Sequence, residues 1–71
     1  MDIFDFLRKT VHELVGVPEE EIRPESTPSE LMLDSFDVEE LVIDVESKYD
    51  VFLSEPKFET LSDLVELVAA A

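Results

Sequence analysis

Apolar residues recur at three- and four-residue spacing in three separate stretches, and this periodicity limits the fold more than any other feature of the chain. The first stretch covers residues 3–15, the second covers 35–49, and the third follows Thr60. Such spacing gathers apolar side chains on one face of an α-helix. No stretch alternates apolar and polar residues as a half-buried strand would. The sequence therefore predicts an all-α protein.

Residues that favour helix ends lie at the boundaries of these stretches. Asp2 can cap the start of the first helix, and Gly16 can end it in the left-handed conformation. Two further pairs have the three-residue spacing of a capping box: Asp34 with Asp37, and Thr60 with Asp63. The predicted second helix therefore begins near Ser35, and the predicted last helix begins after Thr60.

The connections between the helices differ in length. Three of the four prolines lie in residues 17–34, which form a long loop by ordinary standards. Ile22 and Leu31 are expected to attach this loop to the core. Residues 51–59 form a shorter connector, in which one helical turn is expected after Pro56. The predicted architecture is a small four-helix bundle with three main helices and one short helix.

Length and charge narrow the class of protein. The 71 residues make one domain, residues 1–71, whose net charge is −14. This charge argues against binding of nucleic acid, which requires basic patches, and favours basic protein partners. The chain has no cysteine and no apolar run near the ~20 residues of a membrane span. We therefore expect a monomeric cytoplasmic protein.

The second helix carries apolar residues on two opposite faces. Phe36 and Ile43 fall opposite the face expected to enter the core. In one interpretation, the long loop covers Phe36, and Ile43 is an ordinary surface residue. In the other, the two residues form a docking stripe, flanked by acids, for a basic partner. The predicted core residues are Val38, Leu41, Val42, Val45 and Tyr49 of this helix, with Leu61, Leu64, Val65 and Val68 of the last.

Ser35 places a hydroxyl group at the start of this helix. Six acids and no Lys or Arg lie from Asp34 to Glu46, so no neighbour in the sequence would activate Ser35 as a nucleophile. The only histidine, His12, falls on the polar side of the first helix. Ser35 is therefore either a helix cap or an attachment point, not a catalyst. The acids lack the glycine and ligand spacing of an EF-hand, and no dedicated metal site is predicted.

Residues 31–37, LMLDSFD, resemble the attachment motif of acyl carrier proteins. The resemblance extends along nearly the whole chain. A series of matching segments in the same order is far more specific than a lone Asp-Ser pair. The other segments that resemble the family are GV at 16–17, EEI at 20–22, ST at 26–27, SEL at 29–31, EL at 40–41, VE at 45–46, YD at 49–50 and TLSDL at 60–64.

The resemblance implies a carrier, not an enzyme. Ser35 would bear a 4′-phosphopantetheine arm that a phosphopantetheinyl transferase installs from coenzyme A, and Asp34 would help that enzyme to recognise the site. Acyl groups would travel on the arm as thioesters in fatty-acid, polyketide or specialised lipid biosynthesis. Acyl-activating, condensing or acyltransferase enzymes would dock through basic patches. The expected partner face comprises Phe36, Asp37, Glu39, Glu40, Ile43 and Asp44.

Three departures from the family pattern suggest a specialised carrier. Met32 stands where the family usually has glycine, so we expect a differently shaped loop before Ser35. Phe36 stands where leucine is usual, and the connector at residues 53–58 looks shorter. Two alternatives stay open: an aminoacyl carrier, such as a D-alanyl carrier, and an acidic helical adaptor that is never modified.

Overall fold

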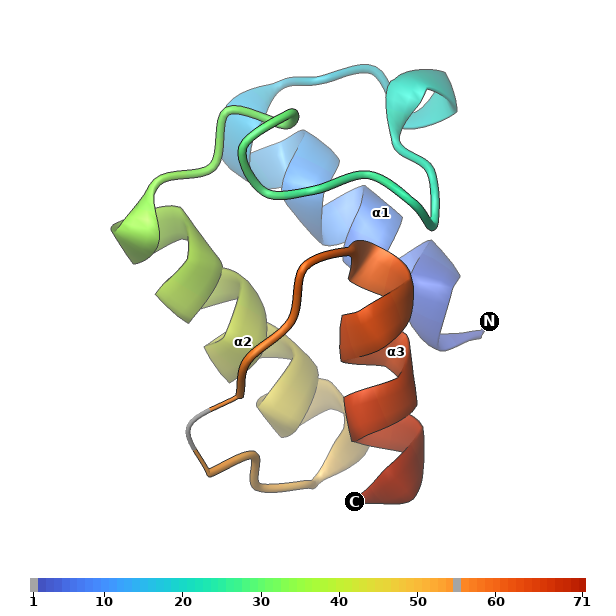
Figure 1. The fold of residues 1–71 in the computed structure, drawn as a ribbon, viewed down its shortest axis with the longest axis vertical. Helices are drawn as coiled ribbons and strands as arrows, with labels where there is room; N and C mark the ends of the chain where they lie inside the picture. Colours follow the sequence, from blue (N-terminus) through green and yellow to red (C-terminus); the bar gives the residue numbers. More distant parts are fainter. Residues whose placement is uncertain (1, 55) are drawn as a thin grey trace.

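The structure is a computed structural model that describes residues 2–54 and 56–71 (Figure 1). It contains α1 (Ile3–Val15), the short 3₁₀ turn η1 (Glu19–Glu21), α2 (Ser35–Tyr49) and α3 (Leu61–Ala70). The described residues include no strand, so the predicted all-α class is confirmed. The three main helices begin where their caps predicted, and α1 ends before Gly16, as predicted.

The fourth helix was predicted in the wrong connector. The described residues between α2 and α3 contain no helical turn after Pro56, whereas the one short turn, η1, lies in the first loop. The capping box of α3 explains the absence, because it holds Thr60 in extended backbone with φ −120° and ψ 163°. Only three residues separate Pro56 from Thr60, too few to close a turn before the chain must extend. Residues 2–54 and 56–71 therefore form three helices and a 3₁₀ turn.

Every helix has its first turn capped by a side chain. The Asp2 carboxylate accepts from the Asp5 N–H at 2.8 Å in α1. In α3 the Thr60 hydroxyl accepts from the Asp63 N–H at 3.2 Å, and Asp63 accepts in return. The N–H groups of Thr60 and Glu59 both donate to the Asp63 carboxylate, and they lower its pKa below the ordinary value.

The core lies where the three helices meet. The predicted residues Leu41, Val45, Leu61, Leu64 and Val68 are buried there, and α1 contributes Leu7 and Val11. Val38, Tyr49 and Val65 are partly buried against this cluster, and the Tyr49 ring meets the Phe6 ring edge-on at 5.9 Å. Val42 is 9% exposed but lies outside the central cluster.

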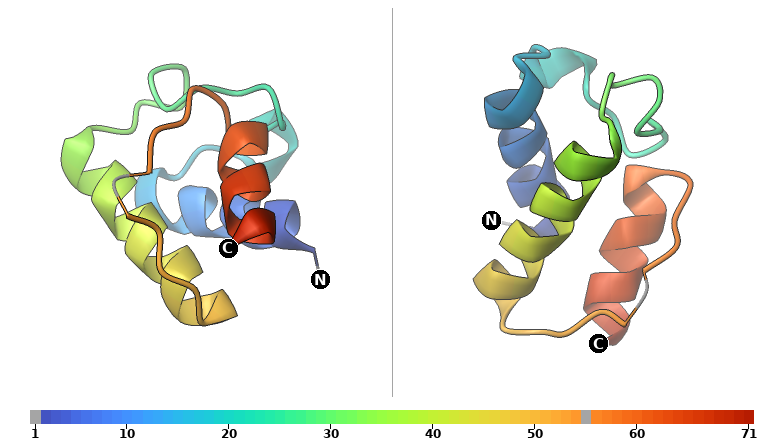
Figure 2. Two further views of the ribbon diagram at one scale, coloured as in Figure 1. Left: turned by 60° about the horizontal axis from the view of Figure 1, so that its bottom comes forward. Right: turned by 90° about the vertical axis from the view of Figure 1, so that its left-hand side faces the viewer.

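The long first loop is attached to α3 as well as to the core. Ile22 and Leu31 are buried, as predicted. Figure 2 shows the loop crossing the end of the bundle where α3 begins. The Leu61 N–H donates to the Ser26 carbonyl at 3.0 Å, and the Ser62 N–H donates to the Pro24 carbonyl at 2.8 Å. Loop carbonyls thus accept hydrogen bonds from N–H groups that have no partner within α3.

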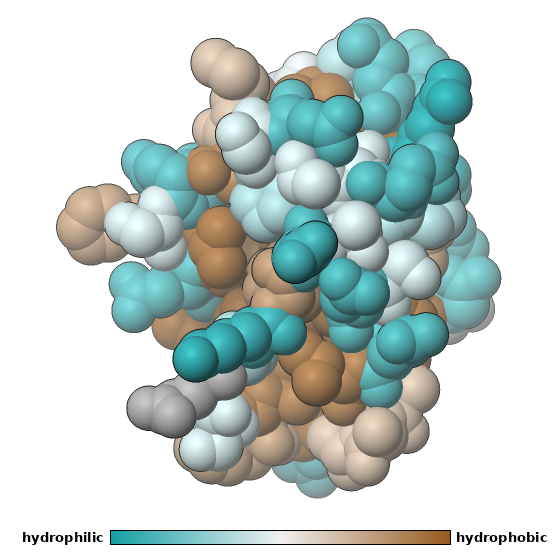
Figure 3. Space-filling model, viewed as in Figure 1, coloured by the Kyte–Doolittle hydropathy of each residue, from teal (hydrophilic) through white to brown (hydrophobic). Residues whose placement is uncertain are grey.

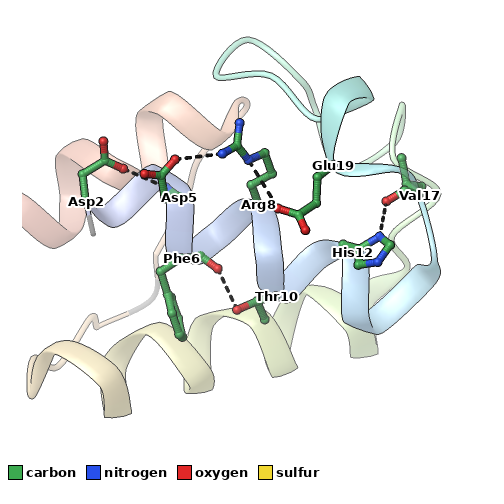
Figure 4. A network of polar contacts seen from close by, with 8 residues as sticks. All are labelled: Asp2, Asp5, Phe6, Arg8, Thr10, His12, Val17 and Glu19. Atoms are coloured by element: carbon green, nitrogen blue, oxygen red, sulfur yellow. Dashed lines mark hydrogen bonds and ion pairs between the residues drawn. The ribbon is translucent and has the colours of Figure 1, made fainter.

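The protein is strongly negative, and it is small relative to the range of electrostatic forces at low salt. Arg8 pairs with Asp5 at 3.0 Å and with Glu19 at 3.7 Å, and so links α1 to η1 (Figure 4). The longest dimension of the molecule is 28 Å. The Debye length is about 30 Å at 0.01 M salt and about 3 Å at 1 M. At low salt, therefore, every carboxylate repels every other.

Raising the ionic strength is expected to stabilise the fold. Moving from about 0.01 M to about 0.5 M salt should raise Tm by about 5 °C, because screening weakens the repulsion. Thermal unfolding followed by circular dichroism measures this shift. Sodium and magnesium chloride at equal ionic strength should act alike if screening alone operates. A Tm that does not change with either salt would contradict the repulsion argument.

Candidate attachment site

Ser35 is the first residue of α2, and Asp34 is its cap. The Asp37 N–H donates to the Asp34 carboxylate at 2.9 Å, and the Asp34 N–H donates to the Asp37 carboxylate at 3.3 Å. This capping box confirms the predicted pair and shows that the interpretation of Ser35 as the cap is wrong. The Ser35 side chain is exposed, and its hydroxyl makes no hydrogen bond to the described residues. The hydroxyl is therefore free for attachment.

The backbone at the start of α2 suits a phosphate group. The N–H groups of Asp37 and Val38 bond to Asp34. The N–H groups of Ser35 and Phe36 have no partner within the described residues. A helix N-terminus attracts anions through such N–H groups and the positive end of the helix dipole. The Asp34 carboxylate opposes this attraction, although its position is already explained by its role as the cap.

The loop before Ser35 is firmly held. The Leu31 N–H donates to the Thr27 carbonyl at 3.1 Å, and the Leu33 N–H donates to the Pro28 carbonyl at 2.9 Å. Leu31 and Leu33 are buried, whereas Met32 between them is 80% exposed. Met32 has a φ of 63°, in the left-handed region that glycine enters most easily. The methionine therefore adopts a positive φ without the conformational freedom of glycine.

Met32→Gly is expected to stabilise the protein. The left-handed conformation costs a residue with a side chain about 1–2 kcal/mol, and the greater freedom of glycine in the unfolded chain offsets about half of this gain. An exposed methionine side chain loses little packing when it is removed. We expect a rise in Tm of about 2–6 °C, measured by thermal unfolding. A fall in Tm would show that contacts of the Met32 side chain outweigh its backbone strain.

The apolar residues of the predicted partner face are exposed. Phe36 is 78% exposed and Ile43 is 57% exposed, so the interpretation in which the long loop covers Phe36 is wrong. Glu39 and Glu40 are also exposed, whereas Asp37 and Asp44 are half-buried. Figure 3 shows hydrophobic side chains that reach the surface among hydrophilic ones on the side where α2 and α3 lie together.

A groove runs beside α2, starting one turn after Ser35. It has a volume of about 310 Å³ and is lined by Val38, Glu39, Val42, Ile43 and Pro56. Val42 faces this groove, which explains why it is buried but lies outside the central core. Sequence reasoning missed the groove because Pro56 comes to α2 from the following connector, and periodicity within one helix does not predict that contact.

The remaining candidate residues lie apart from this site. His12 is exposed at the end of α1, where its Nδ1 lies 2.8 Å from the Val17 carbonyl oxygen (Figure 4). No group of three or more His, Cys, Asp or Glu among the described residues could hold a metal ion. In residues 2–54 and 56–71, no helix is long and apolar enough to cross a membrane. Phe52 is also exposed, at 81%, and its exposure was not predicted from the sequence.

Comparison with known proteins defines the class of this helical domain. The family described as "Phosphopantetheine attachment site" matches residues 5–71. The chain is 32% identical over 69 residues to an acyl carrier protein of Streptococcus thermophilus, covering 96% of this chain and 93% of that protein. It is 34% identical over 70 residues to one from Helicobacter hepaticus (97% and 92% covered) and 39% identical over 69 residues to one from Campylobacter lari (96% and 90%).

The chain belongs to the family of acyl carrier proteins. The resemblance seen in the sequence is thereby confirmed. Members of this family are carriers and not enzymes, and they hold a covalently attached 4′-phosphopantetheine. The free hydroxyl and unpaired N–H groups at the start of α2 are compatible with such a group.

Proposed function

We propose that Ser35 bears the phosphopantetheine arm and that the protein carries acyl groups as thioesters from one enzyme to another. The observation that carries the proposal is the state of the Ser35 hydroxyl, which is exposed at the first position of α2 and unbonded within the described residues. The attached group supplies a thiol, which a chain without cysteine does not have. The protein supplies a fixed attachment point and a surface for recognition.

Attachment requires an enzyme, and the only reacting group that this chain contributes is the Ser35 hydroxyl. The Ser35 Oγ forms a bond to the phosphorus that carries pantetheine in coenzyme A, and the adenosine bisphosphate leaves. The hydroxyl proton passes to a base of the phosphopantetheinyl transferase, because no basic side chain of the described residues bonds to the Ser35 hydroxyl, and His12 contacts the Val17 carbonyl oxygen. Asp34 keeps the helix start in place and is proposed to help the transferase recognise Ser35, together with a metal ion held by that enzyme.

The exposed face of α2 is the proposed docking surface for partner enzymes. Phe36 and Ile43 are seven positions apart, so they lie two turns apart along one face. Glu39, Glu40 and the half-buried Asp37 and Asp44 surround them with negative charge. Acids steer a basic patch toward the surface, while the apolar pair contributes most of the contact energy. Like charge between copies opposes self-association, which supports a monomer.

The groove beside α2 favours an acyl cargo over an amino acid. Its lining is mainly apolar, with Val38, Val42 and Ile43 beside Pro56. An alkyl chain gains free energy from such a surface, whereas a charged amino group loses solvation there. Enzymes of fatty-acid, polyketide or specialised lipid synthesis are accordingly the proposed partners. Loading by an acyl-activating enzyme and failure of aminoacyl-activating enzymes, both read from intact mass, would distinguish this carrier from an aminoacyl carrier.

The attachment itself is tested by weighing the protein. After incubation with coenzyme A and a broad-specificity phosphopantetheinyl transferase, we expect the mass of one phosphopantetheine group to be added. Fragmentation of the intact chain should place the added mass on Ser35. If a control carrier is modified in the same reaction and this protein gains no mass, the carrier proposal fails and the unmodified-adaptor alternative is favoured.

Ile43→Ala is expected to weaken docking but leave the fold intact. Removing an exposed apolar side chain from the docking surface should raise the KM of a partner enzyme for the loaded carrier by about 3- to 10-fold. Tm should stay within about 3 °C, because surface substitutions usually change stability little. Phe52→Ala, in the connector that follows α2, serves as the control for loss of an exposed apolar group. A large fall in Tm for Ile43→Ala would place Ile43 in the core.

A further inference from the structure

Met32 combines backbone strain with an exposed apolar side chain. Its φ of 63° is unfavourable for any residue with a side chain, and the hydrogen bonds of Leu31 and Leu33 hold it there. At 80% exposure, the side chain buries too little surface to offset this cost. Packing within the protein therefore does not explain a methionine at this position. Strain of this kind is commonly found at functional sites.

The position of Met32 indicates which surface it belongs to. It lies three positions before Ser35, so the two Cα atoms are at most about 11 Å apart. On the other side of Ser35, Phe36 is 78% exposed. Ser35 is thus bracketed along the chain by two large apolar side chains, one in the loop and one on α2. Both side chains are exposed and near Ser35 in the chain, so a protein that reaches the Ser35 hydroxyl can contact them.

We propose that Met32 is a recognition residue for the phosphopantetheinyl transferase and fits into an apolar recess on that enzyme. This inference rests on the proposed function of Ser35. Among the partners, the transferase alone forms a bond at the Ser35 Oγ, so it has to cover the surface around that atom. Enzymes that act on the cargo meet the far end of the arm and have no such requirement. Methionine suits the contact because its flexible, polarisable side chain adapts to an apolar recess.

Met32 touches no reacting atom in this proposal, so its effect falls on binding. We expect Met32→Asn to raise the KM of the transferase for this protein, and to lower kcat/KM by about tenfold, with kcat nearly unchanged. Asparagine is chosen because it tolerates a positive φ better than most residues, so the loop keeps its shape while the apolar contact is lost. Met32→Leu, which keeps an apolar side chain of similar size, should restore most of kcat/KM.

The experiment measures initial rates of modification by intact mass, with coenzyme A and the phosphopantetheinyl transferase of the source organism. Phe52→Asn is the matched control, because Phe52 is 81% exposed and lies beyond the other end of α2, whose fifteen residues span about 22 Å. It should be modified at the rate of the unaltered protein.

Equal kcat/KM for Met32→Asn and Phe52→Asn would overturn the recognition role. The recognition role would also be overturned if Met32→Leu were modified slowly and Met32→Asn rapidly, because the effect would then come from loop conformation. Absence of any mass gain in the unaltered protein would instead overturn the function proposed for Ser35.

Discussion

The Ser35→Ala variant is expected to keep the mass of its unmodified chain after incubation with coenzyme A and a phosphopantetheinyl transferase. Alanine has no oxygen to which the phosphorus could be joined, so the loss should be complete. The fold should survive, because the Ser35 hydroxyl makes no hydrogen bond to the described residues and Asp34 caps α2. Alanine is also a favourable helix residue. Intact mass and thermal unfolding of the same sample measure both effects.

A second serine on the same helix provides the control. Ser47 is exposed on α2, as Ser35 is, but it lies three turns further along. Ser47→Ala should therefore gain the full mass of the arm. Modification of Ser35→Ala at the normal rate would place the attachment elsewhere in the chain and remove the basis for the proposed site.

Leu41→Ala is expected to cause the largest loss of stability. The Leu41 side chain is 0% exposed in the core between the helices. Removing a buried leucine side chain costs about 3 kcal/mol through lost burial and the cavity left behind. A domain of this length is stable by only about 4–10 kcal/mol. We expect Tm to fall by about 12–20 °C, measured by calorimetry or circular dichroism.

Ile43→Ala provides the contrast for this prediction. Ile43 lies two residues after Leu41 on the same helix but is 57% exposed. The Tm of the Ile43→Ala variant should therefore stay close to that of the unaltered protein. Similar losses from the two substitutions would show that α2 is packed on both faces, and this would contradict the docking surface proposed for Phe36 and Ile43.

Local signals predicted the helices of this protein well. The capping pairs Asp34 with Asp37 and Thr60 with Asp63 form hydrogen bonds between residues three apart, so the sequence alone reveals them. Helical periodicity likewise separated Leu41, which is buried, from Ile43, which is exposed. Both kinds of signal depend on neighbours within a few residues.

Some features were not predictable in the same way. The expected turn after Pro56 is missing because a local signal competes with it: the cap of α3 holds Thr60 in extended backbone. Other features depend on residues that are distant in the sequence. The groove forms because Pro56 of the connector and Val42 of α2 line the same surface. The positive φ of Met32 could not be read from its residue type, because the hydrogen bonds and buried leucines on either side impose it.

The contact between the first loop and α3 also affects the order in which the protein can mature during synthesis. The carbonyl groups of Pro24 and Ser26 receive their hydrogen bonds from Ser62 and Leu61, which leave the ribosome last among these residues. Until that segment emerges, the loop that leads to Ser35 lacks these partners and the core lacks Leu61 and Leu64. A nascent chain that ends before α3 therefore presents Ser35 without its finished surroundings. The folded surroundings of Ser35 are therefore complete only after α3 has emerged.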